Sequence, residues 1–157
     1  MTKFPYEVTE LASGLFKLSF IDFPTLNLFS KSHYVLRLEA TWALNALVSI
    51  RIRRGLAIPK PTEALDTIPI AEHIAFRLRL YWGMQDNGLS REDFAREIGI
   101  SKQMVDNILG GDDEETHSPY IEAIASQELD GGNNGSNVSS LSHTSREGTA
   151  KLALLAV

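Results

Sequence analysis

Two patterns of hydrophobic and polar positions divide the first part of the chain. Alternation with a period of two residues covers 4–10 and 15–22, and Ala12-Ser13-Gly14 between them has the composition of a turn. These segments predict a β-hairpin. Phe23-Pro24 then interrupts the alternation, and the apolar residues of 26–29 predict a short third strand.

The next segment changes to the period of a helix. Ser32 is a suitable N-cap for a long helix that ends at about Arg54, and Gly55 provides its C-terminal stop. Basic residues in the last turn complement the negative end of the helix dipole. The positions expected to face a sheet are Leu36, Ala40, Ala43, Leu44, Leu47 and Ile50. One such helix is long enough to cover one face of a small sheet.

Two proline-containing segments follow this helix. Pro59 and Pro61 keep their surroundings extended and predict a linker over 59–66. Residues 67–70 form a second extended segment, which Pro69 restricts to the edge of a sheet. A further helix is predicted from about Ala71 to Gln85.

Residues 89–109 predict two short amphipathic helices separated by a tight turn. Ser90 caps the first helix, with Asp93 placed as in a capping box, and Ser101 caps the second. Gly99 suits the turn because it tolerates a positive φ, and Ala95 allows close helix crossing. The side chains expected to face inward are Phe94, Ile98, Met104, Val105 and Ile108. This arrangement resembles a helix-turn-helix.

The second of these helices has an outward face suited to DNA bases. Amide side chains such as Gln103 and Asn107 can bond adenine edges bidentately, and Lys102 can reach a guanine or a phosphate. The candidate DNA-binding residues are Ser101, Lys102, Gln103, Asp106, Asn107 and Arg91. The alternative is a helical bundle whose polar face only meets water. A DNA-binding form is expected to be a dimer, since one module holds few cations.

The charge distribution changes the first impression of an acidic protein. The net charge is −5. Residues 1–66 hold eight basic and six acidic residues, 67–111 five and six, and 112–157 two and eight, which gives +2, −1 and −6. The acidity therefore lies beyond residue 111, beginning with a run of four carboxylates at 112–115 that repels phosphate.

Other chemistry is weakly represented. The chain has no cysteine, which excludes disulfides, thiolate zinc sites and cysteine nucleophiles and suits a reducing, cytoplasmic location. Neither a signal peptide nor a membrane span is predicted. The four histidines are far apart, so no metal site is expected. The chain has neither a phosphate-binding glycine loop nor a serine in a nucleophile elbow, so no cofactor or catalytic residue is expected and the chain is not expected to be an enzyme. An acidic cluster for two-metal hydrolysis could be formed by Glu7, Glu10, Asp22 and Glu39. These four residues are more simply interpreted as solvated side chains of the strands and the helix.

The last part of the chain is predicted from composition. Ser118-Pro119 indicates the start of a helix that would close the preceding bundle. Residues 130–150 are rich in Gly, Asn and Ser and are predicted to be disordered. Residues 151–157 are apolar again and predict a terminal strand that docks on the core or on a partner.

The order of these parts resembles the HicB antitoxin family. The hairpin, Ile21-Asp22-Phe23-Pro24, a third strand, the Ser32-capped helix and the exit Ile58-Pro59-Lys60-Pro61 are followed by Ile68-Pro69-Ile70 and the helix-turn-helix-like segment. The resemblance implies an α+β fold in which a three-stranded sheet with one long helix, partially RNase H-like, occupies 1–58. The linker 59–66 and an all-α helix-turn-helix domain at 67–129 would follow.

The resemblance also implies a function. A HicB-type antitoxin neutralises a HicA-like toxin, an mRNA interferase, and represses its own operon by binding double-stranded operator DNA as a homodimer or a higher even-numbered oligomer. The alternative is an orphan regulator of phage or mobile-element origin without a toxin partner. Thr25-Leu26-Asn27 stands where the family often has a glycine and a cysteine, which keeps this alternative open.

Overall fold

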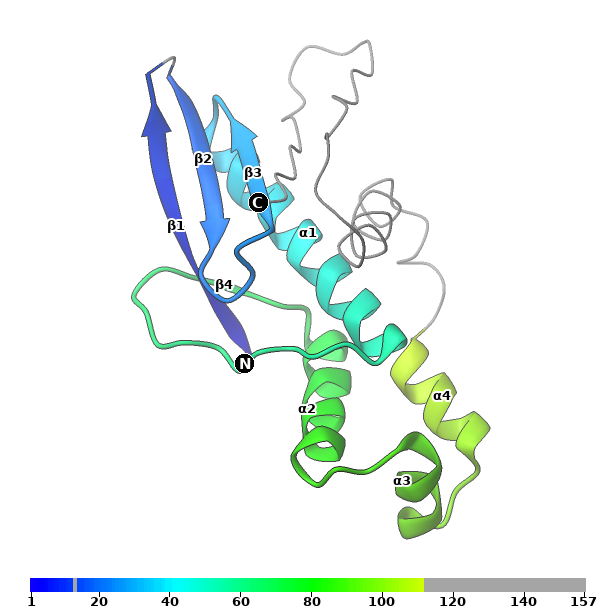
Figure 1. Cartoon of the computed structure of the whole chain (residues 1–157). Coiled ribbons are helices and arrows are strands. Elements are labelled where there is room, and N and C mark those ends of the chain that lie inside the picture. Colours follow the sequence, from blue (N-terminus) through cyan, green and yellow to red (C-terminus); the bar gives the residue numbers. More distant parts are fainter. Residues whose placement is uncertain (13, 112–157) are drawn as a thin grey trace, which may run out of the picture.

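The computed structural model of the chain describes residues 1–12 and 14–111. In this part, an antiparallel sheet of four strands in the order β3-β2-β1-β4 is combined with four helices, which makes the fold α+β (Figure 1). The elements are β1 (Lys3–Leu11), β2 (Leu15–Phe20), β3 (Asn27–Ser30), α1 (His33–Arg54), β4 (Thr67–Pro69), α2 (Glu72–Asp86), α3 (Arg91–Ile98) and α4 (Lys102–Gly110).

The predicted hairpin and third strand are confirmed. β1 pairs with β2 from Tyr6 opposite Phe20 to Leu11 opposite Leu15, and β2 pairs with β3 on its other side. Gly14 closes the hairpin with a φ of +67°, and its N–H donates to the carbonyl of Leu11 at 3.1 Å. A positive φ costs glycine little, so this residue permits the tight turn.

The sheet has four strands, and the prediction of three was wrong. β4 pairs antiparallel with β1, with Phe4 opposite Ile68, and lies at the sheet edge as Pro69 requires. A segment this short has no periodicity of its own, and its partner lies more than sixty residues earlier in the chain. The first strand of the predicted second domain therefore completes the sheet of the first, and the division into two domains stays a prediction.

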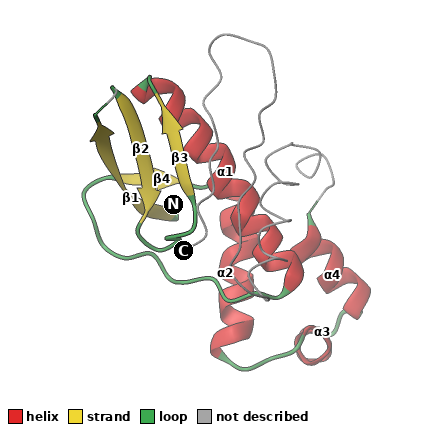
Figure 2. Ribbon diagram, turned by 45° about the horizontal axis from the view of Figure 1, so that its top comes forward, coloured by secondary structure: helices red, strands yellow, loops and turns green. Residues whose placement is uncertain are grey.

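The long helix α1 is confirmed with both of its ends. Ser32 Oγ accepts from the Val35 N–H at 3.4 Å, and Gly55 adopts the left-handed conformation with a φ of +71°. The helix lies along one face of the sheet and continues beyond it to α4 (Figure 2). All the positions predicted to face the sheet are buried: Leu36, Ala40, Ala43, Leu44, Leu47 and Ile50.

The buried side chains form one hydrophobic core that joins the sheet to the helices. It extends from Phe4 in β1 through Leu44 in α1 to Ile74 in α2 and Leu109 in α4. The helix predicted over 71–85 is α2, which begins one residue later. The core therefore supports all four helices.

The segment predicted as a linker is fastened to elements on both sides. The Trp82 indole N–H in α2 donates to the Ile58 carbonyl at 2.9 Å, and Lys60 Nζ lies 2.6 Å from an Asp86 carboxylate oxygen. On the sheet side, the backbone N–H and hydroxyl of Thr62 donate to Asp22 at 3.1 and 2.6 Å. These contacts hold the segment that connects α1 to β4 against α2 and against the loop that contains Asp22.

Three predictions lie outside the described residues: the helix from Ser118, the disordered segment 130–150 and the apolar strand 151–157. Within the described part of the chain, no helix has the length and apolar character needed to cross a membrane.

Candidate nucleic-acid interface

The helices α3 and α4 begin and end as their sequence predicts. Ser90 Oγ accepts from the Asp93 N–H at 3.0 Å, and Ser101 Oγ accepts from the Met104 N–H at 3.1 Å. The Asp93 carboxylate accepts from the Ser90 hydroxyl at 2.6 Å, where a capping box would use the Ser90 backbone N–H. This bond holds the pKa of Asp93 below its ordinary value. Gly99, with a φ of +74°, ends α3.

The predicted inward faces are correct in part. Ala95 and Val105 are buried as expected, while Phe94 and Ile108 are half-buried. Ile98 and Met104 were expected inside but are 49% and 51% exposed. α3 ends at Ile98, its last residue, and α4 turns Val105 and Leu109 toward the core.

Arg91, predicted to contact DNA, lies at the junction of three helices. Its guanidinium donates to the Ile52 and Arg53 carbonyls at the end of α1, at 2.9 and 3.0 Å, and to Asp106 Oδ1 in α4 at 2.9 Å. Its side chain is 25% exposed. Arg91 thus binds carbonyls of the last turn of α1, one of which, that of Ile52, also accepts from the Gly55 N–H at 3.2 Å. A side chain so placed fixes the orientation of α4 relative to α1.

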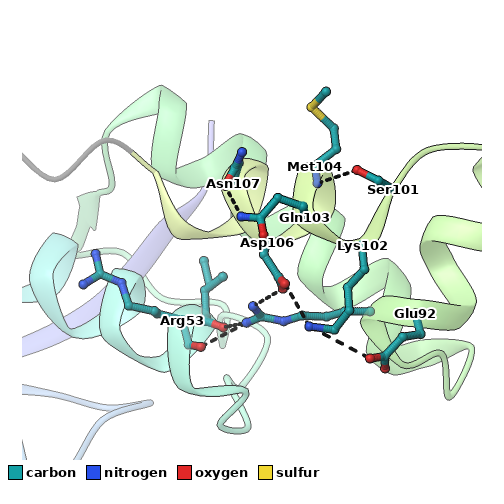
Figure 3. A network of polar contacts seen from close by, with 10 residues as sticks. Arg53, Glu92, Ser101, Lys102, Gln103, Met104, Asp106 and Asn107 are labelled. Carbon is teal, nitrogen blue, oxygen red and sulfur yellow. Dashed lines mark hydrogen bonds and ion pairs between the residues drawn. The ribbon is translucent and has the colours of Figure 1, made fainter.

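Lys102 and Asp106 form a surface network with Arg91 and α3 (Figure 3). Lys102 Nζ lies 2.9 Å from Asp106 Oδ2 and 3.9 Å from Glu92 Oε1. Hydrogen bonds from Arg91 and then Lys102 hold the pKa of Asp106 below its ordinary value. The bond to Asp106 raises the pKa of Lys102, so both groups are charged at neutral pH. Asp106, predicted to point outward, is thus turned partly inward.

Gln103 and Asn107 are exposed on α4 and bonded to each other. The Gln103 amide N–H donates to Asn107 Oδ1 at 3.0 Å across one helical turn (Figure 3). That bond uses the donor end of one amide and the acceptor end of the other. The opposite ends, Gln103 Oε1 and Asn107 Nδ2, are an acceptor and a donor on the same face of α4.

Arg53 is a member of this surface that the sequence analysis did not identify. Its guanidinium lies at the C-terminal end of α4, with Nη2 3.4 Å from the Gly110 carbonyl. Arg53 is exposed and belongs to α1, so its side chain adds positive charge beside α4. The sequence indicated only a basic last turn of α1, because 57 residues separate Arg53 from Gly110.

The acidic residues considered for metal-dependent hydrolysis are not gathered into a site. Asp22 accepts the two hydrogen bonds from Thr62, whereas Glu39 is buried on α1. Residues 1–12 and 14–111 contain no group of three or more His, Asp or Glu arranged to hold a metal ion.

The comparisons with known proteins add no family assignment. No protein-family model matches this chain, and no curated protein is significantly similar to it.

Proposed function

We propose that this protein is a sequence-specific DNA-binding repressor in which α3 and α4 act as a helix-turn-helix. The observation that carries the proposal is the exposed amide pair Gln103–Asn107 on α4, a helix held in place by its own cap and by Arg91. Such a second helix typically enters the major groove, with its N-terminal residues on the base edges.

The amide pair matches the edge of an adenine. Adenine presents N7 as an acceptor and N6 as a donor in the major groove. The Asn107 amide N–H would donate to N7 while Gln103 Oε1 would accept from N6, and the bond between the amides would keep them at a fixed separation. We infer that the two residues read one base pair as a unit.

Of the cations around α4, Lys102 and Arg53 would contact phosphates. Lys102 is partly neutralised by Asp106 and Glu92, and Arg91 is directed toward α1. Arg53 adds a cation beside the end of α4. With so few basic groups on one copy, tight binding requires a dimer with two half-sites about one helical turn apart.

We further propose that the repressor is a HicB-type antitoxin. The support for this part is the resemblance in the order of elements, in which the sheet and α1 correspond to the partial RNase H-like domain and would cover a HicA-like toxin. The alternative, an orphan regulator, keeps the same DNA-binding surface. A titration against a HicA-like ribonuclease encoded beside this chain separates them, because only the antitoxin would bind it tightly and inhibit it.

The first experiment is a fluorescence-anisotropy titration of the full chain against DNA upstream of its own reading frame and against scrambled DNA. At about 150 mM salt, a preference of about a thousandfold for its own DNA is expected. Equal affinity for both DNAs would contradict the repressor.

Variants then test the assignment of residues. Gln103→Ala and Asn107→Ala should each cost about 1–3 kcal/mol against the preferred DNA, and the double variant should cost less than their sum. Lys102→Ala should weaken binding to all sequences and flatten the salt dependence. Asn87→Ala, which removes an exposed amide away from α4, and Arg96→Ala, which removes an exposed cation of α3, are matched controls. Additive effects of the two amides would contradict their action as a unit.

A further inference from the structure

The N-terminal half of α1 carries an exposed stripe of large apolar side chains. Tyr34, Leu38 and Trp42 are spaced four residues apart, which places them on one side of the helix. They are 78%, 39% and 51% exposed. We refer to these three residues as the α1 stripe.

The same side of α1 is covered further along the helix. Asn45 and Ile52 follow Leu38 at intervals of seven residues, which keeps them near the same side. Asn45 Oδ1 accepts from the Ala71 N–H at the start of α2 at 3.0 Å, and Ile52 is fully buried. The α1 stripe is therefore the exposed continuation of a helix face that elsewhere belongs to the core.

The size of the stripe favours a segment of the same chain as its occupant. From the exposed fractions, the three side chains offer roughly 250–400 Å². Stable complexes between separate proteins bury about 800 Å² on each partner, so the stripe by itself is too small for a second copy. A segment of the same chain does not incur the loss of translational and rotational freedom that a separate molecule does.

We propose that residues 151–157 of the same chain dock on the α1 stripe. This segment, Lys-Leu-Ala-Leu-Leu-Ala-Val, supplies three leucines and a valine for apolar contact. α4 ends beside the C-terminal end of α1, where Arg53 meets Gly110. From there the stripe lies roughly 17–29 Å back along α1, at about 1.5 Å per residue. Residues 112–150 can span about 130 Å when extended, so the segment reaches the stripe.

The absence of cysteine from the chain permits a direct test by disulfide trapping. Leu38→Cys combined with Leu154→Cys should form an intramolecular disulfide about ten times faster than Leu65→Cys combined with Leu154→Cys, because Leu65 is exposed but lies off the stripe. The rate should not change on tenfold dilution. Equal rates for the two pairs would overturn the proposal, and so would faster cross-linking between two chains carrying Leu38→Cys alone than between two carrying Leu65→Cys alone, which would assign the stripe to a second copy.

A second measurement uses the fluorescence of Trp42, observed by itself after the second tryptophan of the chain is changed, Trp82→Phe. Changing Leu154→Asp and Leu155→Asp together in the full chain should expose Trp42 and shift its emission to longer wavelength, with about a twofold increase in acrylamide quenching. Leu141→Asp, outside the segment, is the control and should leave both unchanged. Identical emission and quenching with and without the two aspartate substitutions, both in the Trp82→Phe protein, would overturn the proposal. Neither measurement involves DNA, so the outcome is independent of the proposed repressor function.

Discussion

The sheet with α1 and the pair α3–α4 are held together by different interactions. Most of the large buried side chains, such as Phe4, Phe20 and Leu44, belong to the sheet and α1. In α3 and α4, only Ala95, Val105 and Leu109 are buried. The short helices rely in addition on their serine caps and on the hydrogen bonds of Arg91.

This difference shows how the small helix pair α3–α4 can be kept in a fixed orientation. Isolated helices of eight or nine residues are barely stable in water. Here the end of α1 extends past the sheet and offers carbonyls to Arg91, which also binds Asp106 in α4. The sheet and α1 therefore hold α3 and α4 through the hydrogen bonds of Arg91 in addition to the shared hydrophobic core.

The largest effect is expected in the larger region. Leu44→Ala should lower the free energy of unfolding by about 2–5 kcal/mol, because it leaves a cavity in the core beneath α1. Urea denaturation measures this change. Leu65→Ala, at a fully exposed leucine, should stay within about 0.5 kcal/mol of the wild type. Similar losses in both variants would show that burial does not distinguish the two positions.

The second-largest loss of stability is expected at Arg91, where α1, α3 and α4 meet. Arg91→Ala removes three hydrogen bonds of a partly buried guanidinium and should cost about 1–3 kcal/mol of stability. Arg96→Ala is the control, since Arg96 is 78% exposed and pairs only with Asp93 on its own helix among the contacts described here. In hydrogen exchange, the amides of α4 should lose more protection in Arg91→Ala than those of β2. Equal loss in both elements would contradict a local role for Arg91.

The cap of α4 should have a smaller effect. Ser101→Ala leaves the Met104 N–H without its side-chain acceptor and should cost about 1 kcal/mol. Ser101→Gly should cost only a few tenths of a kcal/mol. Thermal unfolding of the three proteins at one pH compares them, and an Ala variant as stable as the Gly variant would argue against capping.

The smallest effect concerns pH. The pKa of Asp106 is lowered by Arg91 and Lys102 from its ordinary value of 3.8, so its ionised form stabilises the folded state. That contribution is present above pH 3.8 and is lost as the pH falls through the lower pKa of the folded protein. Asp106→Asn should therefore lose less stability than the wild type on acidification below about pH 4. Parallel stability curves for the two proteins would contradict this assignment.

Much of the fold was predictable because its signals are local. The alternation in β1 and β2, the apolar period of α1 and the capping by Ser32, Ser90 and Ser101 depend on residues a few positions apart. Helix ends in particular are set by one side chain bonding a nearby N–H. The sequence therefore determined the elements, their order and the polar face of α4.

Only the tertiary structure decided which elements meet. The sequence of β4 is too short to predict its pairing with β1. Arg91 forms its hydrogen bonds with α1 and α4 rather than within its own helix. The exposure of Met104 follows from how α4 is turned against the core. These outcomes depend on contacts between residues distant in the chain, for which a local pattern holds no signal. The sequence thus determined which side chains each helix carries, and packing against α1 determined where the amide face of α4 lies.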